Sequence, residues 1–222
     1  MSYKYPYKSQ LKKELAKANA GIDYFVWDAG ELKNLLAQAH KPIVEIGGPT
    51  FDGYYFLDTV PLTSKPVITN ISKNPLPYSA KAKLAAKKVN TIVDATNMPY
   101  KDASISMFLM KCMSISSDWW LDLPEEQKDA ASATYNKEYS YARLEMAQVA
   151  AGTLSPQKVT YAQRVKIFLE AKRCLVNDGL FFTDGTIEDI VILQKLGFTL
   201  IAYVQLIENN CSSYEFVMKK TT

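Results

Sequence analysis

The segment from residue 43 to residue 53 limits the possible folds of this chain more than any other. It begins as a short apolar strand with one acidic residue, Glu45, and it continues directly into a glycine-rich turn. The apolar residues 54–57 then allow a helix to start. A strand, a tight glycine turn and a helix start bring the backbone close to a nucleotide-like ligand. The segment therefore predicts a strand–helix unit with a ligand site at the end of the strand.

Apolar runs alternate with helical patterns along the rest of the chain. Further strands are predicted at residues 67–71, 91–93, 105–113, 180–183, 199–207 and 214–218. Helices are predicted at residues 8–19, 28–39, 79–88, 124–150, 155–176 and 186–196. The alternation indicates a mostly parallel sheet with helices on both faces, whereas the last two strands follow a short turn and should pair antiparallel.

We therefore expect an α/β fold with a Rossmann-like sheet of seven strands, mostly parallel, ending in an antiparallel C-terminal hairpin. The 222 residues are 48% hydrophobic, which suits a single domain over residues 1–222. Residues 1–40 should form a helical N-terminal extension of a core at 41–222, and a helical insert should follow the fourth strand at about 120–152.

Charge and the reactive residue types exclude several classes of function. The net charge of +3 is too small to indicate a nucleic-acid or anionic-membrane partner, and no apolar run is long enough to span a membrane. His40 is the only histidine, so a histidine-rich metal site is excluded and no metal is expected. The cysteines, Cys112, Cys174 and Cys211, lie far apart, which favours a reducing, cytoplasmic setting.

Four segments resemble, in the correct order, motifs of the class I S-adenosylmethionine-dependent methyltransferases. Residues 44–48 resemble the first motif, and residues 67–72 are similar to the second strand. Residues 94–105 resemble the aspartate-alanine, methionine-proline and aspartate-x-serine run of the family, and residues 168–179 resemble the helix and turn before the fifth strand. The likeness extends over residues 41–219, and the predicted final hairpin matches the end of the family's sheet.

The resemblance implies S-adenosylmethionine as the cofactor and assigns a role to several residues. Gly47 and Gly48 would let the backbone approach the methionine part of the cofactor. Asp94 would accept a hydrogen bond from the adenine amine, and Ala95 would offer a backbone N–H nearby. Asn70 stands where the family has an acidic residue that holds the ribose hydroxyls, and an asparagine forms weaker hydrogen bonds than a carboxylate.

The glycine loop departs from the family pattern in which glycine recurs at every second position. Only Gly47 fits that pattern, while Pro49 removes a backbone donor and Phe51 replaces a further glycine. Glu45 at the strand end and Asp52 in the loop are candidate acidic contacts to the cofactor. Each can equally be a structural residue of its turn.

On the side where acceptors enter in this family, Asp118, Trp119, Trp120 and Tyr141 are candidate substrate-site residues. Trp119 and Trp120 can stack on a flat acceptor or lie in the core. Tyr141 can cap the pocket or belong to ordinary helix packing, and Asp118 is a candidate acceptor for the proton that the substrate loses.

The function predicted from these patterns is S-adenosylmethionine-dependent methyl transfer to an unidentified acceptor, expected to be a small molecule. The alternative is a protein that has kept the fold and lost the chemistry, and that acts as a binding or interaction module. A nicotinamide-dependent oxidoreductase is disfavoured, because the glycine spacing does not match the dinucleotide fingerprint. The sequence indicates neither the acceptor nor the oligomeric state.

Overall fold

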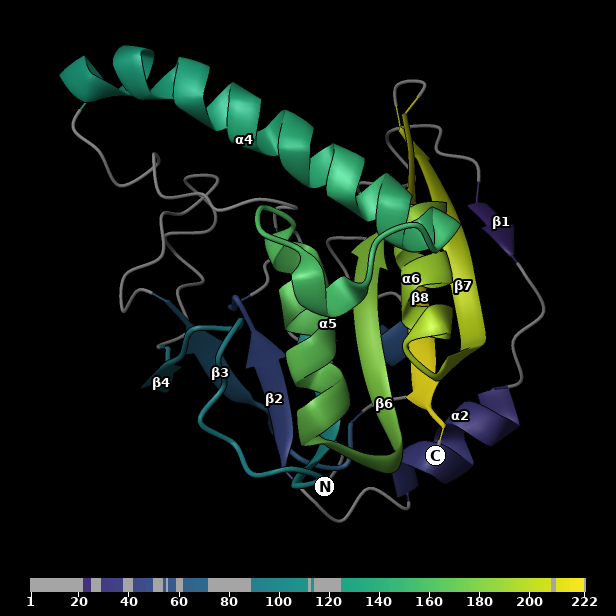
Figure 1. Cartoon of the computed structure of the whole chain (residues 1–222). Helices are drawn as coiled ribbons and strands as arrows, with labels where there is room; N and C mark the ends of the chain where they lie inside the picture. Colours follow the sequence, from purple (N-terminus) through teal and green to yellow (C-terminus); the bar gives the residue numbers. More distant parts are fainter. Residues whose placement is uncertain are drawn as a thin grey trace.

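The computed structural model describes residues 22–24, 29–37, 42–49, 54, 56–58, 62–71, 89–111, 113, 125–208 and 211–221. Within these residues one sheet runs through the molecule in the order β1-β7-β8-β6-β5-β2-β3-β4 (Figure 1). Its strands are β1 (Ile22–Tyr24), β2 (Ile43–Ile46), β3 (Val67–Asn70), β4 (Thr91–Ile92), β5 (Ile105–Met110), β6 (Leu175–Gly185), β7 (Phe198–Glu208) and β8 (Cys211–Lys220).

The pairing of the strands confirms the predicted Rossmann-like sheet. The five strands β4, β3, β2, β5 and β6 are parallel, and β8 and β7 form the antiparallel hairpin at the end of the chain. An eighth strand, β1, pairs antiparallel with β7 beyond the seven that were predicted. Its three residues are too few to produce a recognisable alternating pattern.

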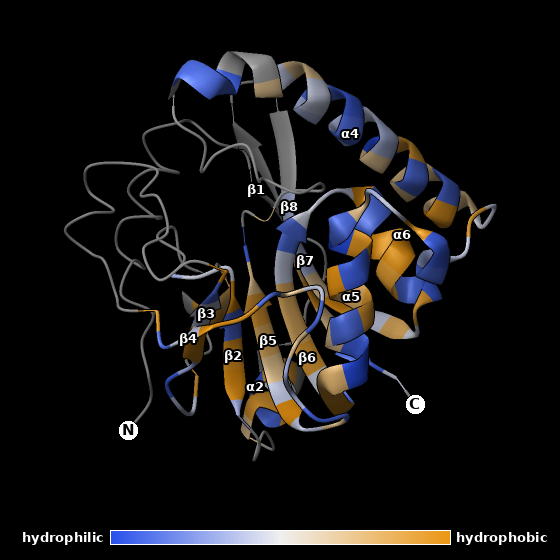
Figure 2. Ribbon diagram, turned by 60° about the vertical axis from the view of Figure 1, so that its left-hand side comes forward, coloured by the Kyte–Doolittle hydropathy of each residue, from blue (hydrophilic) through white to orange (hydrophobic). Residues whose placement is uncertain are grey.

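Helices cover both faces of the sheet (Figure 2). On one face, α5 (Gln163–Cys174) and α6 (Ile187–Lys195) share an apolar core with Phe108 and Met110 of β5, and α4 (Glu125–Ala151) adds Ala142, Met146 and Val149 to that core. On the other face, α2 (Ala29–Ala37) and the short helix η1 (Phe56–Asp58) pack against Met107 and Leu109 of the same strand. Neighbouring residues of β5 thus alternate between two apolar cores, as expected for a strand that is buried on both sides.

The helix predicted at residues 155–176 is wrong in its first third. A short helix η3 (Pro156–Lys158) ends at Val159, which has an extended backbone, and α5 starts only at Gln163. The side chain of Ser155 does not cap a helix. Instead, the carboxylate of Glu145 on α4 accepts hydrogen bonds from the backbone N–H groups of Thr160, Tyr161 and Ala162, at 2.8–2.9 Å. These bonds satisfy the backbone donors of the extended segment just before α5, so the chain can turn there.

Other predicted helices agree with the structure where they can be compared. α2, α4 and α6 lie within about two residues of their predicted bounds, and α6 starts with the predicted capping box of Thr186 and Asp189. The helices predicted at 8–19 and 79–88 lie outside the described residues. Among the helices in the described part of the chain, none is long and apolar enough to cross a membrane.

Candidate functional site

The carboxyl ends of three neighbouring parallel strands carry most of the predicted cofactor residues. Glu45 lies in β2 with Gly47 and Gly48 just after it, Asn70 ends β3, and Asp94 follows β4. From β2 the chain adds β3 and β4 toward one edge of the sheet. It then returns and adds β5 and β6 on the opposite flank of β2, so the direction of strand addition reverses between β2 and β5. In open α/β sheets, such a reversal marks the usual position of a ligand.

Hydrogen bonds connect the ends of β2 and β3. The backbone N–H of Gly48 donates to the carbonyl oxygen of Thr69 at 3.0 Å, and the hydroxyl of Thr69 donates to the carbonyl oxygen of Glu45 at 2.7 Å. The side-chain amide of Asn70 donates to the carbonyl oxygen of Gly48 at 2.8 Å. Asn70 therefore helps to hold the glycine loop, a role that an acidic residue without a donor cannot perform.

Side chains of the protein itself fill the space beside both glycines of the loop. Gly47 has a φ of +69°, and a Cβ atom there would collide with the sulfur of Met113. A Cβ atom on Gly48 would lie 2.7 Å from the carboxyl carbon of Glu45, which is 1% exposed. Gly47 is thus favoured by its positive φ and Gly48 by its packing on Glu45, which is buried beneath the loop that follows it.

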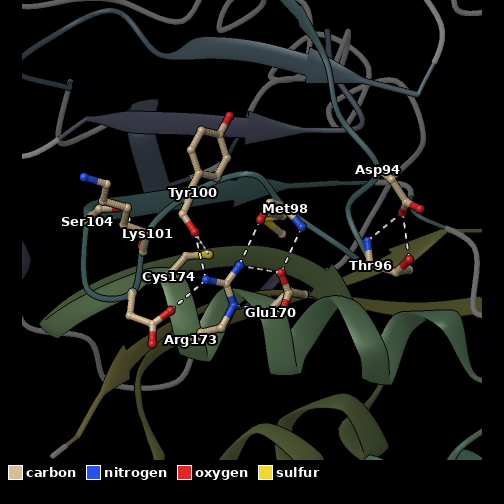
Figure 3. Close-up of polar contacts among 10 residues, drawn as sticks. Asp94, Thr96, Met98, Tyr100, Lys101, Ser104, Glu170, Arg173 and Cys174 are labelled. Carbon is tan, nitrogen blue, oxygen red and sulfur yellow. Dashed lines mark hydrogen bonds and ion pairs between the residues drawn. The ribbon is translucent and has the colours of Figure 1, made fainter.

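Asp94 forms a local turn at the end of β4. Its Oδ1 accepts hydrogen bonds from the backbone N–H and the hydroxyl of Thr96, both at 2.8 Å (Figure 3). The other carboxylate oxygen points away from Thr96, and the structure gives it no hydrogen bond from any described residue. The backbone N–H of Val93 donates to the carbonyl oxygen of Asn70 at 2.9 Å, so this turn lies beside the end of β3. Ala95 is half-buried and packs against the core.

The remainder of the segment 94–105 is fixed by two residues of α5. The guanidinium of Arg173 donates to the carbonyl oxygens of Met98 and Tyr100 at 2.9 and 2.8 Å (Figure 3). Glu170 accepts from the backbone N–H of Met98 at 2.8 Å and from Arg173 at 2.7 Å. The hydrogen bond from Arg173 is the chief reason why the pKa of Glu170 is lowered. The motif-like segment 94–105 and the helix motif at 168–179 are therefore parts of one contact.

The substrate-side candidates are described only in part. Asp118, Trp119 and Trp120, together with the loop residue Asp52, lie outside the described residues. Tyr141 lies on α4, is 40% exposed and has its ring centroid 5.1 Å from that of Tyr161.

A buried ion pair near the predicted site was missed by the sequence analysis. Lys111 directly follows β5, and its Nζ lies 3.3 Å from Oε2 of Glu215 on β8. The other carboxylate oxygen of Glu215 accepts from the backbone N–H of Phe56 in η1, also at 3.3 Å. Burial raises the pKa of Glu215, and the charge of Lys111 offsets part of that rise. Lys111 and Glu215 are each a single charged residue within an otherwise apolar strand segment. Glu45 was singled out in the sequence for the same reason.

A second missed residue, Arg164, joins three segments at this edge of the sheet. Its side chain is 4% exposed. It donates to Oδ1 of Asp189 on α6 at 2.9 Å, to the carbonyl oxygen of Met113 at 2.6 Å, and to the carbonyl oxygen of Asp184 at the end of β6. Arg164 lies one helical turn before Phe168 on the buried face of α5. A charged residue on a buried helix face has to find polar partners, so its position in the sequence could have marked it as a structural or functional residue.

The described side chains do not form a cluster of three or more histidine, cysteine, aspartate or glutamate residues that could hold a metal ion. The charged groups at this edge instead bond to backbone carbonyls, backbone N–H groups and one another. The ends of β2, β3 and β4 lie next to one another in the sheet, and β5 lies on the other side of β2.

Comparisons with known proteins give similar folds at low identity. No family model matches the chain, and no curated protein matches it. Among solved structures, a methyltransferase of Methanosarcina mazei that depends on S-adenosylmethionine is similar over 88% of this chain and 99% of its own, with 11% identity and a TM-score of 0.47. The [4+2]-cyclase SpnF is similar over 97% of this chain and 94% of its own, with 11% identity and a TM-score of 0.45.

A third similar structure, TrmN from Thermus thermophilus, aligns with 86% of this chain at 14% identity and a TM-score of 0.42. The chain spans 48% of the length of TrmN.

Proposed function

We propose that the chain binds S-adenosylmethionine along the carboxyl ends of β2, β3 and β4 and transfers a methyl group to a small-molecule acceptor. One observation carries the proposal. The glycine loop, Asn70 and Asp94 lie at the carboxyl ends of three neighbouring parallel strands, and hydrogen bonds from Asn70 to Gly48 and from Val93 to Asn70 connect these ends. The order is the one that the family resemblance requires for the methionine, ribose and adenine parts of the cofactor.

Each end of the site has a group suited to its part of the ligand. The second carboxylate oxygen of Asp94 is the acceptor for the adenine amine, since Oδ1 is already used by Thr96. Ala95 offers its backbone N–H on the adenine side, and Glu45, Gly47 and Gly48 lie on the methionine side. Asp52, which follows the glycine loop in the sequence, is a further candidate contact to the cofactor in this proposal.

The cofactor, when bound, supplies a methyl group that its sulfonium has already activated. The protein then has mainly to bind the two partners and align them, which fits the lack of a strong catalytic dyad among the described residues at this edge of the sheet. In this proposal the acceptor enters on the side of Asp118, Trp119, Trp120 and Tyr141, and Asp118 receives its proton.

Calorimetric titration of the full chain with S-adenosylmethionine and with S-adenosylhomocysteine tests the proposal. We expect both ligands to bind with a stoichiometry of one. The absence of heat from either ligand at high micromolar concentration, for a protein that circular dichroism shows to be folded, would contradict cofactor binding and the proposed reaction together.

One observation favours a second candidate function, a binding or interaction module that has kept the fold without the chemistry. The sulfur of Met113 and the carboxylate of Glu45 occupy the space beside Gly47 and Gly48, and Asn70 uses its amide on the loop. A loop so filled by its own side chains is stable without a ligand. Under this alternative, the titrations give no binding although the protein is folded.

A further inference from the structure

We propose that Met113 is a ligand-contact residue of the cofactor site, and that its side chain turns aside when a ligand reaches Gly47. The inference rests on the proposed function, since it concerns the same site. It starts from the collision that a Cβ atom on Gly47 would make with the sulfur of Met113. The thioether therefore lies directly against the one residue of the loop that fits the family's glycine pattern.

The position of Met113 in the fold places it beside the expected ligand. β5 ends at Met110, which pairs with Ile46 at the end of β2. Three residues later, the side chain of Met113 lies against Gly47. This contact lies where the strand order reverses between β2 and β5, the usual ligand position in such sheets.

The backbone of Met113 is held while its side chain can move. The guanidinium of Arg164 donates to the carbonyl oxygen of Met113 at 2.6 Å and is itself fixed by Asp189 at 2.9 Å. The side chain of Met113 packs against the core that faces α5 but is not fully buried. A methionine side chain has three rotatable bonds and changes shape at low cost. A ligand can therefore displace the thioether from Gly47 without moving the main chain.

The displacement has a cost for the wild-type protein, because only molecules with Met113 turned aside can take the ligand. The apparent dissociation constant equals the intrinsic constant divided by the fraction of molecules in which Met113 is turned aside. Replacing Met113 with alanine removes the competing side chain, so we expect Met113→Ala to bind S-adenosylhomocysteine about three-fold or more tightly than wild type. Met113→Leu fills the same space with a less flexible side chain and should bind no more tightly than wild type.

Two measurements on the full chain test the inference. The first is calorimetry with S-adenosylhomocysteine on wild type, Met113→Ala, Met113→Leu and Leu169→Ala. Leu169 is a matched control, since it is also partly buried against the same core but lies on α5.

The second measurement is methyl NMR of protein labelled at its seven methionines, with the Met113 signal assigned by its loss in Met113→Leu. We expect saturating S-adenosylhomocysteine to shift the Met113 methyl signal more than those of the buried core residues Met146 and Met218.

The outcomes separate this inference from the proposed function. Tighter binding by Met113→Ala, unchanged binding by Leu169→Ala and a shifted Met113 signal support it. If wild type binds the ligand but its Met113 signal stays in place, or if Met113→Ala binds equally well or more weakly, the inference is wrong while the proposed function stands. If neither wild type nor Met113→Ala binds, both are wrong.

Discussion

The side-chain amide of Asn70 donates a hydrogen bond of 2.8 Å to the carbonyl oxygen of Gly48, and thereby ties the end of β3 to the glycine loop after β2. The family resemblance requires an acidic residue at this position. The structure gives a physical reason for the exchange, because a carboxylate would lose the donor and would place a negative charge against the oxygen of Gly48.

We expect Asn70→Asp to destabilise the fold by about 1–2 kcal/mol and not to improve the affinity for S-adenosylhomocysteine. Urea unfolding and calorimetry measure the two quantities. Asn90→Asp is the matched control, because the Oδ1 of Asn90 accepts from the backbone N–H of Ile68 at 2.9 Å and an aspartate preserves that bond. The control should stay within about 0.5 kcal/mol of wild type. Equal stability of the two variants would show that the bond to Gly48 is not needed.

The substitution Asp94→Asn distinguishes the roles of the two carboxylate oxygens of Asp94. An asparagine keeps Oδ1 as the acceptor for Thr96, so the turn should survive. The second oxygen becomes an amide nitrogen, which cannot accept from the adenine amine. We expect the affinity for S-adenosylhomocysteine to fall about ten-fold while the melting temperature stays unchanged. Asp178, an exposed residue of β6, provides the control Asp178→Asn, and an Asp94→Asn variant that binds as well as wild type would remove Asp94 from the site.

The sequence predicted the sheet because its apolar runs are long and regularly separated by helical segments. Parallel strands end at the same edge, so Glu45, Asn70 and Asp94 were expected to lie near one another from their places in the strands. The break before α5 was not predictable in the same way. It depends on Glu145, which lies 15 residues before Thr160 and belongs to another helix.

The buried contacts of the site were also beyond the sequence pattern. Lys111 and Glu215 are separated by 104 residues, and their contact depends on how β5, β6 and β8 are placed side by side. In the sequence, the two glycines indicated only that a ligand could approach the backbone closely. Only the packing shows that Met113 and Glu45 occupy that room.

The ion pair of Lys111 and Glu215 should behave as one unit. Removing one partner leaves the other charge in a buried place, so we expect Lys111→Met and Glu215→Gln each to lose about 3 kcal/mol. The double variant removes both charges and keeps an oxygen to accept from Phe56, so it should be within about 1 kcal/mol of wild type. Urea unfolding of the four proteins gives the coupling energy. Losses that simply add in the double variant would mean that the two side chains do not stabilise each other.

The carboxylate of Glu145 holds the turn that leads into α5, with Oε2 accepting from the backbone N–H groups of Tyr161 and Ala162 at 2.8 Å. We expect Glu145→Ala to cost about 1–2 kcal/mol, because three backbone N–H groups of the turn lose their acceptor. Glu145→Gln keeps an acceptor and loses the charge that favours a helix N-terminus, so it should lie between alanine and wild type. Gln148→Ala, at an exposed position of the same helix, should change stability by less than about 0.5 kcal/mol. The prediction is wrong if all three variants unfold at the same urea concentration.

The contact of Glu170 with Arg173 should make stability depend on pH in the acid range. Its hydrogen bond from Arg173 lowers the pKa of Glu170 in the folded protein, so the folded state holds the proton less tightly than the unfolded state. The resulting stability is present above the unfolded pKa of about 4.3 and is lost as the pH falls through the lower folded value. We expect Glu170→Gln to cost about 1 kcal/mol at pH 7, since the pair is partly exposed, and to cost progressively less below about pH 4. Urea unfolding between pH 3 and pH 8 measures this difference, and in an Arg173→Met background the same substitution should lose most of its pH dependence. A cost that is constant with pH in both backgrounds would show that Arg173 does not stabilise the ionised form of Glu170.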